Sequence, residues 1–258
     1  QFTVMENVAR FGMHKIDLTD GAVLEKGCVY IVPLQESLCL RKRTSAIANP
    51  KSSTGRLDVF ARLITDYGVE FDRVRECYKG PLYAEISPRS FSVVARTGSR
   101  LMQLRVKRGS PPPSDRLLRD LDNQVGLVDS VPGDANIEKG SLLVTVDTEG
   151  AETGGLIGYR AKKHAGLIDL DRIGHYDPAD YWDEIHARPD RGLILDPDDF
   201  YILASREAIT VPSDHAAEML AYDTSVGEFR VHYAGFFDPG FGDAEVGAML
   251  AQAMERVG

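Results

Sequence analysis

The chain has 258 residues, of which 43% are hydrophobic, and its formal net charge is −9. This length allows one large domain or two smaller ones, with ample material for a core. The negative charge argues against a general nucleic-acid binder, because such a surface should be basic. No apolar stretch is long enough to span a membrane.

The cysteines bear on the cellular compartment, and the chain ends bear on whether residues are missing. Cys28, Cys39 and Cys77 form an odd set without metal-ligand spacing, and no signal peptide precedes them. We therefore expect reduced thiols in a cytoplasmic protein. The chain begins without Met and ends in an Ala/Met-rich tail, so we expect native residues to be missing at both ends.

In chain order, a strand pattern at residues 30–40 is followed by a polar stretch, Asn-Pro-Lys-Ser-Ser-Thr-Gly-Arg, at residues 49–56. Its two cations, three hydroxyls and backbone N–H groups can bind one anion. It is not a Walker loop, because the G-x-x-x-x-G-K-[ST] pattern is absent and no helix pattern follows. Residues 57–64 instead alternate like a strand. A polar hairpin with incidental cations is the alternative interpretation.

A further strand is predicted within residues 78–89, and Glu85 interrupts its apolar pattern. A carboxylate on a buried strand should have a partner or a raised pKa, and either can serve general acid–base chemistry. The alternative is that Glu85 lies on the solvent-exposed face of an alternating strand.

Three consecutive prolines at residues 111–113 divide the chain, since they remove donors and enforce extended backbone. A short helix follows, with Ser114 or Asp115 as its N-cap. Strand patterns resume at residues 141–146 and 156–161, and residues 178–185 can form one or two helical turns. Residues 201–211 resemble residues 30–40, which suggests two copies of one β domain; chance similarity is the alternative. The predicted organisation is 1–109 and 136–258, joined by a linker with a helix at 110–135.

The last notable stretch is residues 232–242, which contain an Asp-Pro-Gly turn at Asp238 with aromatic residues on both sides. The turn signal and the aromatic residues predict a β-hairpin. Its rings and backbone polar groups can grip a flat base, although an ordinary hairpin is the alternative.

Together, these stretches resemble the dCTP deaminase branch of the dUTPase-like superfamily. Its phosphate-binding Arg-Ser-Ser-x-x-Arg stands here at residues 51–56, with Lys51 as a point charge in place of the first arginine. Its catalytic strand, with Gly five residues before Glu, stands at residues 80–85. Its base-binding Ala-x-x-x-Asp-Pro-Gly-aromatic pattern stands at residues 234–241. The resemblance covers most of the chain and is to a long, two-domain bacterial form. It implies an all-β, distorted jelly-roll or β-barrel fold, duplicated in tandem, with a few short helices.

The resemblance also implies an activity, the hydrolytic deamination of dCTP to dUTP and ammonia, which supplies dUTP for thymidylate synthesis. Glu85 would be the general acid–base group. Ser52 and Arg56 would orient water or stabilise developing charge, and Lys51 and Ser53 would hold phosphates. The expected base- and sugar-binding residues come from both halves of the chain: Thr65, Asp66, Ala234, Phe236, Asp238 and Phe241.

The expected cofactors and partners follow from the same resemblance. The chain lacks the His-x-Glu and Pro-Cys-x-x-Cys patterns of zinc deaminases, so we expect no zinc and no other protein-bound metal. Mg²⁺ would arrive bound to the triphosphate. The expected partners are dCTP and dUTP, with dTTP left open, and further copies of the chain in a homo-oligomer with pseudo-trimeric domain packing. Nucleic acid and membrane are not expected partners.

Each half lacks a motif that the other keeps. Residues 65–68 replace an Asp-Pro-Gly hairpin in the first half, and residues 223–227 replace a Ser-Ser-x-x-Arg loop in the second. We therefore predict that one half supplies the phosphate loop and Glu85, and the other part of the base pocket. Three alternatives remain. They are a dUTPase or bifunctional enzyme giving dUMP, with Asp66 or Asp238 as base, an inactive nucleotide-binding regulator, and a β-sandwich without a ligand.

Overall fold

The computed structural model describes residues 2–109, 112–129, 133–190, 192–220 and 235–242. Strands outnumber helices in these ranges, and the longest described helix, α3, has 11 residues. The predicted all-β class with a few short helices is therefore confirmed. None of the described helices is long and apolar enough to cross a membrane.

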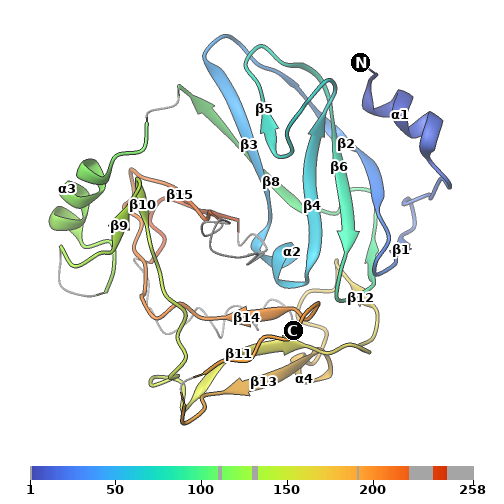
Figure 1. Cartoon of the computed structure of the whole chain (residues 1–258). Helices are drawn as coiled ribbons and strands as arrows, with labels where there is room; N and C mark the ends of the chain where they lie inside the picture. Colours follow the sequence, from blue (N-terminus) through green and yellow to red (C-terminus); the bar gives the residue numbers. More distant parts are fainter. Residues whose placement is uncertain (1, 110–111, 130–132, 191, 221–234, 243–258) are drawn as a thin grey trace.

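The first half of the chain, residues 2–109, is a sandwich of two antiparallel three-stranded sheets (Figure 1). One sheet has the order β2-β6-β4 and the other β5-β3-β8, and a smaller sheet contains β1 and β7. Apolar side chains of both large sheets meet between them, which is what holds two sheets face to face. The strands are β1 (Ala22–Leu24), β2 (Tyr30–Cys39), β3 (Thr44–Pro50), β4 (Val59–Thr65), β5 (Arg73–Val74), β6 (Lys79–Pro88), β7 (Val93–Ala95) and β8 (Met102–Arg108).

Strand β4 shows how the sequence sets the two faces of its sheet. Val59, Ala61 and Leu63 are buried in the core, whereas Phe60 and Arg62 alternate with them on the outward face. In β6, Leu82, Ala84 and Ile86 are buried in the core, so Glu85 lies on the opposite, outward face, where Tyr83 and Ser87 are also buried.

Two helices belong to the first half. Helix α1 (Val4–Phe11) begins with a capping box, in which Thr3 and Glu6 bond each other's backbone N–H groups. Helix α2 (Ser52–Arg56) forms within the polar stretch at residues 49–56, and the Gly55 N–H donates to the Lys51 carbonyl over 2.9 Å. The sequence did not predict this helix, because five residues are too few to show a helical period.

The second half, residues 112–242 where described, is built on the sheet β13-β11-β14. Its elements are α3 (Asp115–Val125), β9 (Ile137–Glu138), β10 (Ser141–Leu142), β11 (Leu156–Ala161), β12 (Ile168–Asp169), α4 (Pro178–Tyr181), β13 (Trp182–His186), β14 (Tyr201–Leu203), β15 (Ala217–Glu218) and β16 (Phe236–Phe237). The helix capped by Ser114 and the strand at 156–161 are confirmed.

Other predictions for the second half were too long. Within residues 178–185, where one or two helical turns were predicted, one turn forms, and strand β13 follows it. The predicted strands at 141–146 and 201–211 are reduced to β10 and β14. Tandem duplication and its boundaries remain a prediction.

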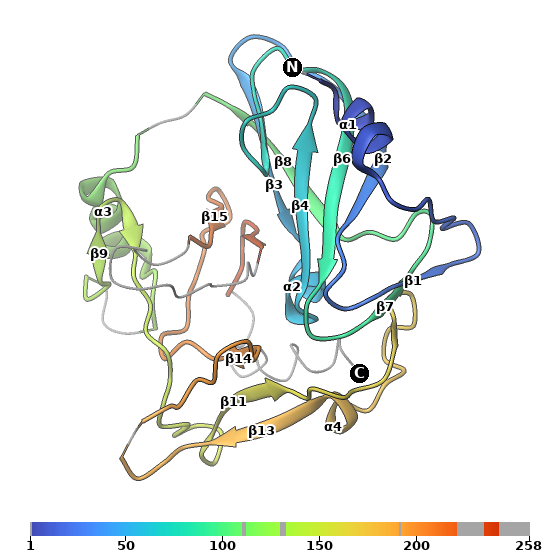
Figure 2. The same ribbon diagram turned by 45° about the vertical axis from the view of Figure 1, so that its right-hand side comes forward.

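The two halves share a core. β12 of the second half pairs in parallel with β7 of the first, and a single apolar cluster contains Phe91 and Val93 together with Tyr181 and Trp182. Figure 2 shows β11, β13 and α4 lying below the first-half sandwich, with α2 at the start of β4, the end of that strand nearer to them.

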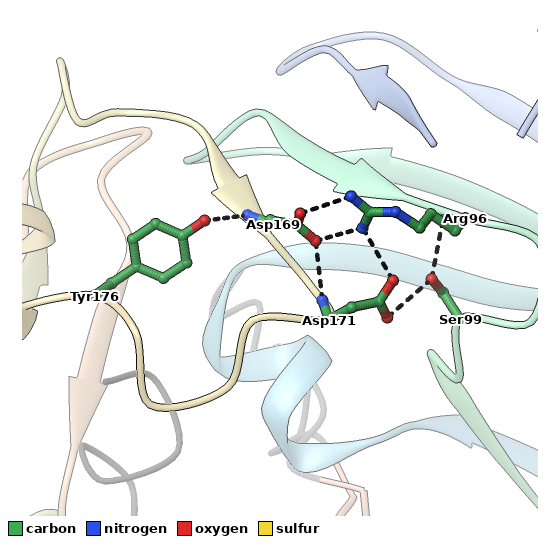
Figure 3. Close-up of polar contacts among 5 residues, drawn as sticks. All are labelled: Arg96, Ser99, Asp169, Asp171 and Tyr176. Carbon is green, nitrogen blue, oxygen red and sulfur yellow. Dashed lines mark hydrogen bonds and ion pairs between the residues drawn. The ribbon is translucent and has the colours of Figure 1, made fainter. Parts of the chain in front are cut away.

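A cluster of polar side chains connects the two halves of the chain next to the paired strands β7 and β12 (Figure 3). The Arg96 guanidinium donates to both carboxylate oxygens of Asp169 over 2.6 and 2.7 Å, and to Asp171 over 3.0 Å. The Tyr176 hydroxyl accepts from the Asp169 N–H over 2.7 Å. Because Arg96 follows β7 and Asp169 lies on β12, these bonds tie the halves together.

Candidate active site

The predicted phosphate loop lies on α2, at the edge of the first half that faces the second (Figures 1 and 2). The Lys51 N–H donates to the Leu101 carbonyl over 2.9 Å, which anchors the start of the loop. Arg56 Nη2 donates to Ser52 Oγ over 3.5 Å. Lys51, Ser52, Ser53 and Arg56 are all half-buried. The structure therefore gathers the predicted cations and hydroxyls on one short, well-anchored helix.

A broad cavity with a volume of about 2730 Å³ lies between the two halves. Ser52, Gly55 and Arg56 of α2 line one side, and β10, β14 and β15 contribute to the other. Because pockets for small molecules usually enclose about 300–1,000 Å³, this cavity is an open groove that is wider than one nucleotide requires. Glu85 is not among its lining residues.

Asp58 is a cavity residue that the sequence analysis missed. Its side chain is buried, and burial raises its pKa to about 6 even though the Ser90 hydroxyl donates to it over 2.6 Å. Asp58 has a left-handed backbone, with φ of 52°, which explains why β4 begins at Val59 rather than at Leu57. Because Asp58 stands within a strand-like sequence pattern, nothing in the sequence indicated that its carboxyl group would be buried at the cavity.

Glu85 lies opposite Arg62, its antiparallel neighbour on β4. Both Nε and Nη2 of Arg62 donate to Oε1 of Glu85, the Nε bond over 3.2 Å. The Arg62 guanidinium also lies 3.9 Å from the centre of the Phe71 ring, a cation–π contact. With its side chain 19% exposed, Glu85 is a largely buried, paired carboxylate and not a free surface group. The sequence predicted a partner or a raised pKa for Glu85, with a solvent-exposed face as the alternative, and did not identify Arg62.

Asp72 belongs to the same neighbourhood. Its carboxylate accepts the Leu63 N–H over 2.7 Å, and burial raises its pKa to about 6. The positive charge of Arg62 opposes this rise, whereas the negative charge of Glu85 adds to it. The carboxyl groups of Glu85 and Asp72 therefore interact with each other and with the Arg62 guanidinium.

Thr65 and Asp66 lie at the opposite end of β4 from α2. Thr65 is buried, and the Asp66 carboxylate accepts the Val4 N–H over 2.8 Å, which anchors the start of α1. A seven-residue strand at about 3.3 Å per residue separates these residues from α2 by roughly 20 Å. Within one chain, the structure does not bring Thr65 and Asp66 together with the phosphate loop.

The Asp-Pro-Gly stretch forms a turn, in which the Phe241 N–H donates to the Asp238 carbonyl over 3.1 Å and Gly240 has φ of 81°. Before the turn, β16 pairs with β15. After it, the Phe241 carbonyl accepts the Val211 N–H over 2.7 Å. The hairpin prediction was therefore wrong for the described residues, because both sides of the turn pair with other segments. Ala234 lies outside the described residues.

This turn segment reaches the phosphate loop. Gly235 has φ of 79°, and a Cβ at this position would lie 3.0 Å from the Pro50 carbonyl oxygen and 3.8 Å from the Ser52 nitrogen. Only a residue without a side chain fits such an approach comfortably. Two of the three predicted motifs, far apart in the sequence, are therefore in contact within one chain, while Glu85 lies on another face.

No three His, Cys, Asp or Glu side chains gather as a possible metal site in the part of the chain that the structure describes. The three cysteines are free and exposed.

Comparison with known proteins identifies the family. Residues 1–110 match the model of the N-terminal domain of 2'-deoxycytidine 5'-triphosphate deaminase, and residues 114–257 match that of its C-terminal domain. A solved structure of 2'-deoxycytidine 5'-triphosphate deaminase from Agrobacterium tumefaciens is 51% identical and superposes with a TM-score of 0.87. That match covers 94% of this chain and 71% of the other, and is consistent with the predicted dUTPase-like β fold.

A curated relative from Pseudarthrobacter chlorophenolicus, named "dCTP deaminase, dUMP-forming", is 34% identical over 89 residues. The matched part is 32% of this chain and 46% of the relative, so it spans less than half of that protein. The two domain models, by contrast, account for nearly all of this chain. The chain therefore belongs to the dCTP deaminase family of hydrolytic enzymes.

Proposed function

We propose that this protein deaminates dCTP to dUTP and ammonia. The observation that carries the proposal is the contact of Gly235 with Pro50 and Ser52, which joins the phosphate loop to the base-binding stretch across the two halves. The family match of both halves supports the same substrate. The cationic and hydroxyl-bearing side chains of α2 suit a triphosphate, because they supply charge and donors.

In the proposed reaction, the oxygen of water bonds to C4 of the cytosine ring, and the bond from C4 to the exocyclic nitrogen breaks. Glu85 takes a proton from the attacking water, and protons reach N3 and the leaving amine, so that ammonia departs. Ser52 and Arg56 orient the water or stabilise the developing charge, while Lys51 and Ser53 hold phosphates. The second half supplies Ala234, Phe236, Asp238 and Phe241 to the base pocket.

The position of Glu85 leads us to include a second copy of the chain in this proposal. It lies on the outward face of the β2-β6-β4 sheet, and its carboxylate is bonded to Arg62 rather than to a residue of α2. We propose that a neighbouring copy of the chain brings Glu85, with Thr65 and Asp66, to the phosphate loop of this one. A homo-oligomer with pseudo-trimeric domain packing provides such contacts.

Mg²⁺ is proposed to enter with the substrate. The described residues of the phosphate loop offer cations and hydroxyls rather than carboxylates, which suits phosphate oxygens and not a resident metal ion. A bound Mg²⁺ would neutralise part of the triphosphate charge.

Substitution of the proposed base tests this function. Glu85→Gln keeps the shape of the side chain and removes the base, so ammonia release from dCTP should fall roughly 10²-fold or more. Glu36→Gln is a matched control, because Glu36 is an exposed carboxylate on the neighbouring strand β2. Ammonia release is followed enzymatically at saturating dCTP. Near-wild-type turnover in Glu85→Gln would refute the assignment.

The product distinguishes the second candidate function. The curated relative is named dUMP-forming, which favours a bifunctional enzyme that also releases pyrophosphate. Chromatography of the nucleotide formed from dCTP separates the two: dUTP with ammonia supports the proposal, and dUMP with pyrophosphate supports the bifunctional alternative. Binding of dCTP or dTTP without ammonia release would indicate an inactive nucleotide-binding regulator.

A further inference from the structure

One side chain of the first half contacts the segment that leads into the Asp-Pro-Gly turn at several points. Arg105 of β8 donates to the Ala217 carbonyl over 3.2 Å and to the Phe237 carbonyl over 3.4 Å. Its guanidinium also bonds the Asp238 carboxylate over 3.0 Å and lies 4.1 Å from the centre of the Phe236 ring. Arg105 therefore binds both β15 and β16 as well as the first residue of the turn.

These contacts lie next to the place where the Asp-Pro-Gly stretch meets the predicted phosphate loop. Gly235 precedes Phe236 directly, and its close neighbours are Pro50 and Ser52 of the phosphate loop and Gln103 of β8. A displacement of β16 along or away from β8 would move Gly235 relative to Ser52 by a similar distance. The guanidinium of Arg105 thus restrains the spacing between the turn and α2.

We propose that Arg105 is a positioning residue for the nucleotide site, which sets the base-binding turn at its working distance from the phosphate loop. This inference rests on the proposed deamination of dCTP. Arg105 acts through β16 and the turn. The chemistry of the contacts requires arginine: a planar guanidinium can stack on a ring and donate in several directions at once, whereas a lysine ammonium is a point charge.

The ion pair with Asp238 is the weakest of these contacts. The Asp238 side chain is 78% exposed, and surface ion pairs contribute little because water screens them. The two carbonyl bonds and the ring contact are more enclosed, since the Arg105 side chain is 23% exposed. A substitution that keeps only the charge should therefore fail to restore the position of the turn.

The experiment compares Arg105→Lys and Arg105→Gln with the control Lys107→Gln. Lys107 lies on the same strand and pairs with Glu218 of β15 over 3.4 Å, but it makes no contact with the turn in the described residues. For both Arg105 variants we expect the KM for dCTP to rise about tenfold with kcat changed less than about threefold, because the variants lose binding rather than chemistry. Lys107→Gln should retain both constants.

Hydrogen exchange gives a readout that does not depend on activity. Peptides covering residues 217–218 and 235–242 should exchange faster in Arg105→Gln, while peptides from β4 and β6 stay protected as in the wild type. Unchanged KM, or full rescue by Arg105→Lys, would overturn the inference, and so would faster exchange throughout the chain. If the wild type releases no ammonia from dCTP, the proposed function fails. The exchange measurement then still decides whether Arg105 holds the turn.

Discussion

Asp169→Asn should loosen the joint between the two halves of the chain. The Asp169 carboxylate accepts two bonds from Arg96 and one from the Asp171 N–H, and its side chain is only 16% exposed. Asparagine has one acceptor oxygen and no charge, and its NH₂ group would face the guanidinium. A hydrogen bond to a charged group contributes about 1.5–3 kcal/mol. Since Arg96 is partly exposed and therefore screened, we expect a loss near the middle of that range, about 2 kcal/mol.

Thermal unfolding followed by circular dichroism measures this effect. For a chain of this size, a loss of about 2 kcal/mol lowers Tm by roughly 4–8 °C. Asp171→Asn is the matched control, because Asp171 also bonds Arg96 but its side chain is 47% exposed, so its loss should be at most about 1 kcal/mol. Equal Tm shifts in the two variants would show that burial of the Arg96–Asp169 pair does not strengthen it.

The same pair predicts a pH dependence. Hydrogen bonds from Arg96 lower the pKa of Asp169 from 3.8 to about 2. Since the folded pKa lies below the unfolded value, the stabilisation is fully present above pH 4 and is lost as the pH falls toward 2. The difference in Tm between wild type and Asp169→Asn should shrink over that window. A constant difference down to pH 2 would contradict the argument.

Two further predictions concern single residues near the site. Gly235→Ala combines a left-handed φ with a Cβ 3.0 Å from the Pro50 carbonyl, so it should destabilise the chain by about 1–2 kcal/mol and raise the KM for dCTP. Gly98→Ala has the same strain, with φ of 95° but open space around its Cβ, and should leave KM unchanged; equal KM effects would refute the role of close approach. For Asp72, the raised pKa of about 6 means that wild-type stability falls as the pH rises from 4 through 6, because the folded state holds the proton more tightly. Asp72→Asn should therefore gain in Tm relative to wild type between pH 4 and pH 7, and a flat difference would contradict this.

Local patterns in the sequence were sufficient for elements with a clear period or cap. The strand at 156–161 has the predicted boundaries and the helix capped by Ser114 has the predicted start, because alternation and capping act over a few residues. Helix α2 was missed, since a single turn leaves no period to detect. For the described residues, the hairpin predicted around Asp238 was wrong for another reason: the turn signal is local, but the segments that pair with β16 and Phe241 lie elsewhere in the chain.

The sequence by itself determined the chemistry available to this protein: a loop with cations and hydroxyls, a carboxylate on a strand and an aromatic Asp-Pro-Gly turn. It also determined the all-β class and the family resemblance. Only the tertiary structure decided which of these groups meet. Gly235 contacts the phosphate loop, Arg105 holds the turn, and Arg62 pairs with Glu85 on a different face. Contacts of this kind depend on how whole sheets pack and pair, so no pattern within a short stretch of sequence can encode them.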